Sequence, residues 1–254
     1  MNWFAQRICE VQLAFMLLTR LPVGRMGRYV PNLSSARWAF PLAGIPIGIF
    51  IAGLFFGFCY SEIPHLLGAV ITLSISLLLT GALHEDGLAD TADGFGGGTT
   101  RKQKLKIMGD SNVGTYGLLC LILTMLARVF SLSSMNNTHQ TFLLLISISM
   151  ISRLTMVFYL NILPPARSKG LGYQASGRNY LSTFFATVIS LPAIIYCGYL
   201  APNCLLAVTI VAITFAYFAK SQIKGQTGDI CGASQLLCET TGWIAIATIS
   251  SVGL

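Results

Sequence analysis

Long apolar runs separated by short polar stretches fill the sequence from residue 38 onward. Several runs approach the roughly 20 residues that an α-helix needs to cross a bilayer. The pattern predicts an all-α, polytopic integral membrane protein with about seven transmembrane helices, folded as one membrane-embedded domain over residues 1–254. The expected spans lie near Trp38–Tyr60, His65–Leu83, Val113–Ser133, Thr141–Leu163, Leu181–Leu200, Cys204–Ala219 and Thr241–Leu254.

The first segment, Met1–Leu21, has a different pattern. Charged residues such as Arg7 and Glu10 alternate with large apolar ones, and Pro22 follows the segment. This mixture predicts an amphipathic helix lying at the membrane interface, with a short tilted span as the alternative. The charges also argue against a cleaved secretory signal.

Composition supports a membrane protein. The chain is 54% hydrophobic and 10% charged, whereas soluble domains carry about 25% charged residues. A net charge of +7 in such a chain reflects cytoplasmic loops and anionic substrates or lipids, so we expect the lipid bilayer and no nucleic acid as partner. The seven cysteines contain no C-x-x-C pair, which indicates neither a zinc site nor a disulfide framework.

Basic residues alternate between successive loops. They occur in residues 20–37, 84–112, 164–180 and 220–240, whereas the intervening loops, 61–64, 134–140 and 201–203, contain none. The positive-inside rule places every basic loop in the cytoplasm. The expected topology is multi-pass with the N-terminus inside and the C-terminus outside.

One stretch carries most of the candidate chemistry. Leu79–Gly98 contains four of the nine acidic residues of the chain, and they follow directly on an apolar run. Asp86, Asp90 and Asp93 stand at i, i+4 and i+7, on one stripe of a helix. Repelling carboxylates on one stripe predict a divalent cation, and hard oxygen ligands favour Mg²⁺ or Mn²⁺. A solvated acidic face without a metal is the alternative.

Two arginines, Arg128 and Arg153, fall inside predicted spans. An ionisable residue inside the membrane is a functional candidate. These side chains would either balance the acidic stretch or clamp a phosphate group. Snorkelling from a span end, or a shifted span boundary, would also explain them.

Further polar candidates flank the spans. His84 adjoins the carboxylates and would serve as a general base or as an orienting hydrogen-bond partner. Lys224 and Asp229 lie in a second polar cluster, where they could contact a phosphate and a metal; a helix cap at Asp229 explains that residue nearly as well. Asp110 is similarly open between a cap and a ligand.

Five motifs in order resemble the cobalamin synthase family, also called adenosylcobinamide-GDP ribazoletransferase, of bacterial vitamin B12 biosynthesis. The most specific, GALHEDGLADTADG at 81–94, matches the pattern G-x-x-H-x-D-G-L-A-D-x-x-D-G. The others are FMLLTRLP at 15–22, FPLAG at 40–44, MGDSNVGT at 108–115 and GQTGDICGA at 225–233. Glu85, where many members have an apolar residue, and Ile230-Cys231 depart from the family pattern without removing a carboxylate.

The resemblance implies an enzyme of the bacterial cytoplasmic membrane, its active site facing the cytoplasm. It would transfer the cobinamide phosphoryl group from adenosylcobinamide-GDP to α-ribazole or its 5′-phosphate, with Mg²⁺ as cofactor and GMP as leaving group. The implied metal ligands are Asp86, Asp90 and Asp93. The implied substrate contacts are Arg128, Arg153, Lys224 and Gln226, and the candidates for the proton acceptor are His84, Asp110 and Asp229.

Three other functions, two enzymatic and one of transport, remain open from the sequence. A CDP-alcohol phosphotransferase would need an arginine where Asp90 stands, and a prenyltransferase would need a second Asp-rich motif where Asp229 stands alone. A cation transporter would line a midplane cavity with its acids, whereas here they cluster near one face. The oligomeric state, a homo-oligomer included, is not fixed by the sequence.

Overall fold

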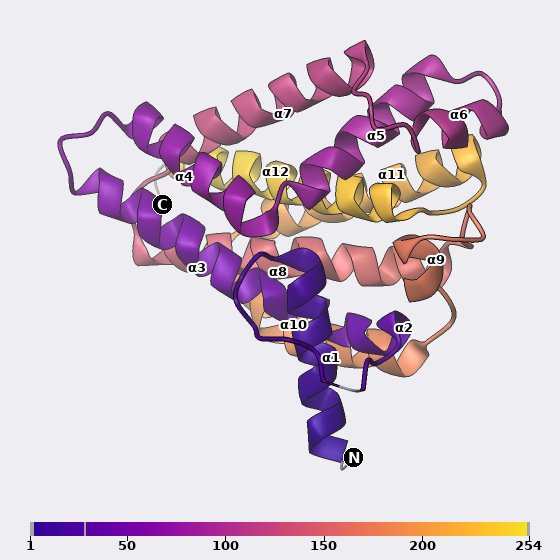
Figure 1. Ribbon diagram of the computed structural model, residues 1–254. Coiled ribbons are helices and arrows are strands. Elements are labelled where there is room, and N and C mark those ends of the chain that lie inside the picture. The colour runs from indigo at the N-terminus through magenta and orange to yellow at the C-terminus, as the bar shows by residue number, and fades with distance from the viewer. Residues whose placement is uncertain (1–2, 28, 253–254) are drawn as a thin grey trace.

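The computed structural model describes residues 3–27 and 29–252; Met1, Asn2, Arg28, Gly253 and Leu254 lie outside the described residues. Within that part the chain is helical (Figure 1). The helices are α1 (Trp3–Leu18), α2 (Leu33–Ala36), the 3-10 turn η1 (Arg37–Ala39), α3 (Phe40–Cys59), α4 (His65–Thr80), α5 (Leu83–Gly97), α6 (Arg101–Ile107), α7 (Thr115–Ser133), α8 (His139–Ile162), α9 (Leu171–Ala175), α10 (Tyr180–Leu200), α11 (Pro202–Ile223) and α12 (Gly228–Val252).

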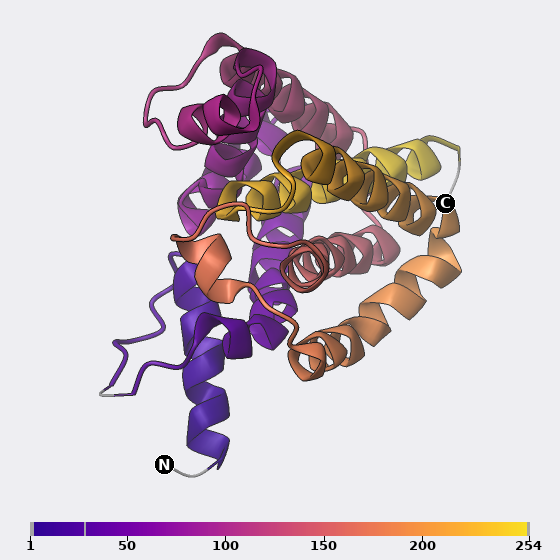
Figure 2. The ribbon, with the colours of Figure 1, turned by 90° about the vertical axis from the view of Figure 1, so that its right-hand side faces the viewer.

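Helices α8 and α12 form the centre of the bundle. α8 packs against α3, α10 and α12, and α12 also packs against α5, α7 and α11 (Figure 2). Small residues allow the closest of these approaches, as is typical of membrane helices. A Cβ on Gly44 of α3 would stand 2.4 Å from the carbonyl oxygen of Ser149 in α8, and one on Gly48 would stand 2.7 Å from the Cα of Ile146. The G-x-x-x-G spacing in α3 therefore fixes α8 beside it.

Five helical segments within the described residues are long and apolar enough to cross a membrane, and the bent pair α4–α5 counts as a sixth. This confirms the polytopic all-α prediction, although the number is below the seven expected. The difference lies at the C-terminus. The run expected at 241–254, whose last two residues lie outside the described residues, falls in α12, and α12 is not among the helices long and apolar enough to cross a membrane. In α8, 83% of the 18-residue apolar stretch is buried inside the protein, against 17% of the corresponding stretch in α11. Helices such as α11 therefore form the outer surface of the bundle.

The chain bends by 90° between α4 and α5. Gly81 and Ala82 both adopt positive φ, 66° and 54°, and the left-handed conformation at Gly81 ends the helix. The predicted span His65–Leu83 thus stops at Thr80, and the acidic stretch forms a separate helix. That helix lies against α12 and α7.

For three of the four basic segments, the charge alternation corresponds to the two ends of the bundle. Helix α6 and the α8–α9 and α11–α12 connections, all of which carry basic residues, gather at one end, on the right of Figure 1. The α3–α4, α7–α8 and α10–α11 connections gather at the other end. The N-terminal segment forms the expected helix, which exposes Trp3, Phe4 and Ile8 and buries Glu10.

Candidate active site

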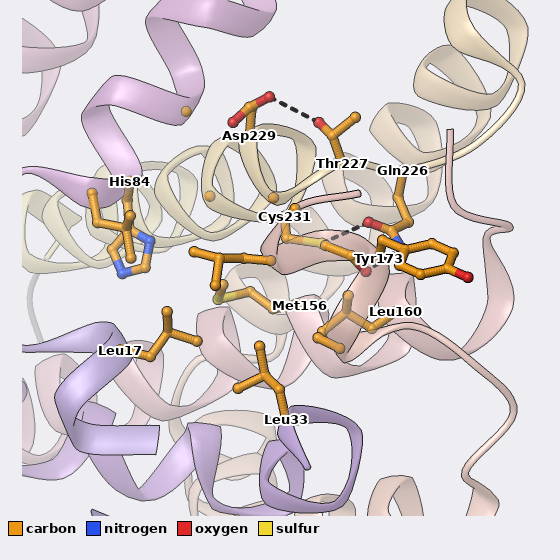
Figure 3. A pocket seen from close by; sticks show the side chains of 18 of the residues that line it. Leu17, Leu33, His84, Met156, Leu160, Tyr173, Gln226, Thr227, Asp229 and Cys231 are labelled. Carbon is orange, nitrogen blue, oxygen red and sulfur yellow. Dashed lines mark hydrogen bonds between the residues drawn. The ribbon is translucent and has the colours of Figure 1, made fainter. Parts of the chain in front are cut away.

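A cavity of about 170 Å³ lies where α5 meets the start of α12; we call it the α5–α12 cavity. Residues of α5, the α8–α9 connection, α9 and the first turn of α12 line its polar side (Figure 3). Its position at the basic-loop end of the bundle makes it the candidate active site.

Asp229 opens α12 at the polar side of this cavity. Its carboxylate accepts a hydrogen bond from the Thr227 hydroxyl at 3.1 Å and lies 3.6 Å from the Arg167 guanidinium. Burial raises the pKa of the Asp229 carboxyl above its ordinary value, and the Arg167 charge opposes that shift. The sequence prediction left Asp229 open between a cap and a ligand, and the structure places its side chain in the cavity.

Asp86 reaches the same cavity from α5. The two helices are held together at Gly87, because a Cβ there would stand 2.8 Å from the carbonyl oxygen of Asp229. Asp90, one turn further along α5, interacts unfavourably with both Asp86 and Asp229. Three carboxylates therefore act on one another here, drawn from two motifs that are remote in the sequence.

Asp93 has a different role. Its carboxylate accepts the backbone N–H of Gly114 at 2.7 Å and that of Gly117 at 2.8 Å, so it satisfies the free donors at the start of α7. Among residues 3–27 and 29–252, no three His, Cys, Asp or Glu side chains are gathered to hold a metal ion. Asp93 stays on the same helix as Asp86 and Asp90 and acts on Asp90 electrostatically, but both of its carboxylate oxygens are engaged at the start of α7. The metal site itself stays a prediction.

His84 is 2% exposed and lines the α5–α12 cavity. Neither of its ring nitrogens has a hydrogen-bond partner in the described structure. Its role as a base or as an orienting residue stays a prediction.

The intramembrane arginines do not line the cavity. Arg128 lies 2.9 Å from a carboxylate oxygen of Glu239 in α12, and Arg153 lies 3.5 Å from the other oxygen. Arg128 also stands over the ring of Trp243, 4.1 Å from its centroid. All three charged side chains are at most 4% exposed. The charge-balance interpretation therefore finds its ion-pair partner in Glu239. Glu85 of the acidic stretch interacts electrostatically with both arginines as well, whereas none of the three aspartates forms an ion pair with them among the described residues.

Of the remaining predicted site residues, one lines the cavity and two do not. Gln226 lines the cavity and donates a hydrogen bond to the Gly172 carbonyl at 3.1 Å. Lys224 and Asp110 are exposed and do not line it. The sequence prediction named neither Arg167 nor Lys169 as a site residue, although both line the cavity. Their loop was marked only by its positive charge.

A sequence profile of cobalamin-5-phosphate synthase matches residues 10–247. The chain belongs to the cobalamin-5-phosphate synthase family. It is similar to the adenosylcobinamide-GDP ribazoletransferase of Mesorhizobium japonicum, with 35% identity over 98% of this chain and 95% of that protein. Proteins of the same name from Azorhizobium caulinodans (35% identity, 91% and 92% coverage) and Bradyrhizobium diazoefficiens (36%, 96% and 94%) are also similar. No solved structure matches the chain significantly.

Membership of the cobalamin-5-phosphate synthase family confirms the resemblance carried by the five motifs. In the structure the two motifs richest in acidic and polar groups, at 81–94 and 225–233, form adjacent walls of one cavity. Two of the motifs that carry the resemblance therefore line the candidate active site.

Proposed function

We propose that this protein transfers the adenosylcobinamide phosphoryl group from adenosylcobinamide-GDP to α-ribazole or its 5′-phosphate, with release of GMP. The family and the names of its relatives support this reaction. The observation that carries it is the meeting of Asp86 and Asp229 with Arg167 and Lys169 in the α5–α12 cavity. Phosphoryl transfer needs mainly positioning and neutralisation of charge, and such a set of side chains supplies both.

Mg²⁺ is the proposed cofactor. Mg²⁺ usually takes one or two protein carboxylates and completes its shell with water and substrate phosphates. Asp86 and Asp90, on successive turns of α5, fit that requirement, whereas Asp93 is occupied by the start of α7. When bound, the ion would neutralise charge on the pyrophosphate oxygens.

The protein groups have separate proposed tasks. Arg167 and Lys169 would bind phosphate oxygens of the donor. A ribose hydroxyl of the acceptor forms the new P–O bond, the P–O bond to GMP breaks, and Asp229 accepts the hydroxyl proton. Among the three candidates for that proton, Asp229 has its carboxylate in the cavity beside the phosphate-binding groups, whereas Asp110 lies outside it.

The membrane setting completes the proposal. The apolar helices agree with a multi-pass protein of the bacterial inner membrane. Because the cavity opens among the basic loops, the positive-inside rule supports an active site that faces the cytoplasm and its soluble nucleotides. The test is to mix the purified protein with both substrates and Mg²⁺ and to measure GMP. Ion flux in vesicles without GMP release would favour a transporter instead.

A further inference from the structure

The α5–α12 cavity has two unlike halves. Asp86, Asp229 and Arg167 form its polar side. The opposite side, which we call the apolar floor, is built from Leu17 and Leu18 of α1, Leu33 of α2, Phe40 of α3, and Met156 and Leu160 of α8. Figure 3 shows Leu17, Leu33, Met156 and Leu160 on the side away from Asp229 and Thr227. A ligand that fills both halves must have one apolar end and one polar end.

Few polar side chains border the floor, and Gln226 among them is already engaged. The Gln226 amide donates to the Gly172 carbonyl, and its oxygen accepts from the Cys231 thiol at 3.8 Å. The His84 ring nitrogens have no partner but are buried from solvent. A base edge with several donors and acceptors, such as that of guanine, would lose its bonds to water here without replacement. The floor therefore suits an apolar aromatic ring.

We propose that the apolar floor binds the benzimidazole ring of α-ribazole, so that the α5–α12 cavity is the acceptor subsite. This inference rests on the proposed function. A benzimidazole has no exocyclic polar groups, and its riboside carries hydroxyls at the opposite end, which matches the two halves of the cavity. The corrin macrocycle and guanosine of the donor remain at the mouth, and only the pyrophosphate reaches Arg167.

The floor is rigid on three sides. Leu18, Phe40 and Leu160 are at most 3% exposed and belong to one apolar cluster that joins α1, α3 and α8. Met156 in the same cluster has an unbranched, adaptable side chain. The shape of the floor should thus limit the size of the base. Leu33, at 8% exposure, belongs to the same cluster but lies on the short helix α2.

The test compares Leu33→Asn with Leu163→Asn in the full-length protein reconstituted in nanodiscs. Leu163 is equally buried, at 7% against 8%, but lies outside the cavity. Equilibrium binding of α-ribazole and of adenosylcobinamide-GDP is measured separately. Leu33→Asn should weaken α-ribazole binding by about tenfold or more, as expected when an apolar contact in a substrate pocket is lost, and should leave donor binding unchanged. Leu163→Asn should change neither.

A second variant, which changes the size of the side chain at position 33, keeps the proposal testable if Leu33→Asn does not fold. Leu33→Phe narrows the floor, so, compared with the unaltered protein, this variant should bind the riboside of unsubstituted benzimidazole better relative to that of the larger dimethylbenzimidazole. Weaker donor binding with unchanged α-ribazole binding in Leu33→Asn, or an equal loss of both, would overturn the assignment. Absence of GMP release by a protein that still binds α-ribazole would count against the proposed reaction and not against the subsite.

Discussion

Gly87 of α5 lies against the backbone of Asp229 of α12, so closely that a methyl group on Gly87 would stand 2.8 Å from the Asp229 carbonyl oxygen. The two residues belong to different motifs, one in the acidic stretch and one in GQTGDICGA. Their contact sets the spacing between the carboxylates of α5 and those of α12. The geometry of the candidate active site therefore depends on a residue with no side chain.

Gly87→Ala should separate the two helices and cut turnover severely. Overpacking of this kind typically costs about 1–3 kcal/mol of stability, so thermal unfolding is measured beside GMP release. Gly57→Ala is the matched control, because a Cβ on Gly57 of α3 would meet nothing within 4 Å. Full activity in Gly87→Ala would show that the close contact is not needed.

Substitution of the aspartates of α5 should have two different effects, one on the Mg²⁺ requirement and one on stability. Asp86→Asn and Asp90→Asn should raise the Mg²⁺ concentration required for activity by at least about 10–100-fold, which is the loss typical when only a partner that orients a metal ligand is removed. Asp93→Asn should instead destabilise the start of α7 by about 0.5–2 kcal/mol, as for a lost helix cap. A Mg²⁺ titration and a melting curve for each variant separate the two effects. The same Mg²⁺ response for all three would restore the single stripe that the spacing predicted.

Glu239 should be essential for folding. Glu239→Gln removes the ion-pair partner of Arg128 and Arg153 and leaves only the more distant Glu85 to balance them, and breaking a buried pair costs about 3–5 kcal/mol. The exposed Glu62→Gln serves as the control. Thermal unfolding in detergent gives the comparison.

Arg153→Gln should likewise lower the yield of folded protein and affect both substrates equally, since its partner lies within the protein. A selective loss of adenosylcobinamide-GDP binding would instead support the phosphate clamp considered from the sequence. Arg153→Lys should recover only part of the stability, because an ammonium group lacks the planar fork of the guanidinium.

The sequence predicted the spans and the acidic motif because both are local signals. Apolar runs reveal helices without any knowledge of their neighbours, and carboxylates at helical spacing reveal a stripe. The pairing of Glu239 with Arg128, 111 residues away, depends on how α7 and α12 meet. The use of Asp93 as a cap likewise depends on where α7 begins. Neither relationship is encoded by spacing along the chain.

Two other features could be predicted from the sequence only in part or not at all. The bend before α5 left a signal in Gly81, a favourable helix-ending residue, although the 90° angle required the structure. The apolar floor left no signal in the sequence. Leu33 and Met156 have the pattern of ordinary core residues, and only the packing of four helices places them in one cavity.

The orientation of the bundle is tested by labelling single cysteines in intact cells, in a background without the partly accessible Cys9, Cys59 and Cys120. Lys102→Cys, at the basic-loop end, should resist a membrane-impermeant reagent, whereas Gln140→Cys at the other end should react. Both positions are exposed. The opposite labelling would place the cavity on the outer face.

The central claim is that the α5–α12 cavity performs phosphoryl transfer, and the most direct measurement is the stoichiometry of GMP release. The purified protein in nanodiscs is mixed with adenosylcobinamide-GDP, α-ribazole and Mg²⁺, and GMP and adenosylcobalamin are quantified together. We predict equal amounts of the two products, a requirement for both substrates, and loss of both products in Asp229→Asn while α-ribazole still binds. GMP release without the acceptor, or unchanged turnover in Asp229→Asn, would contradict the account.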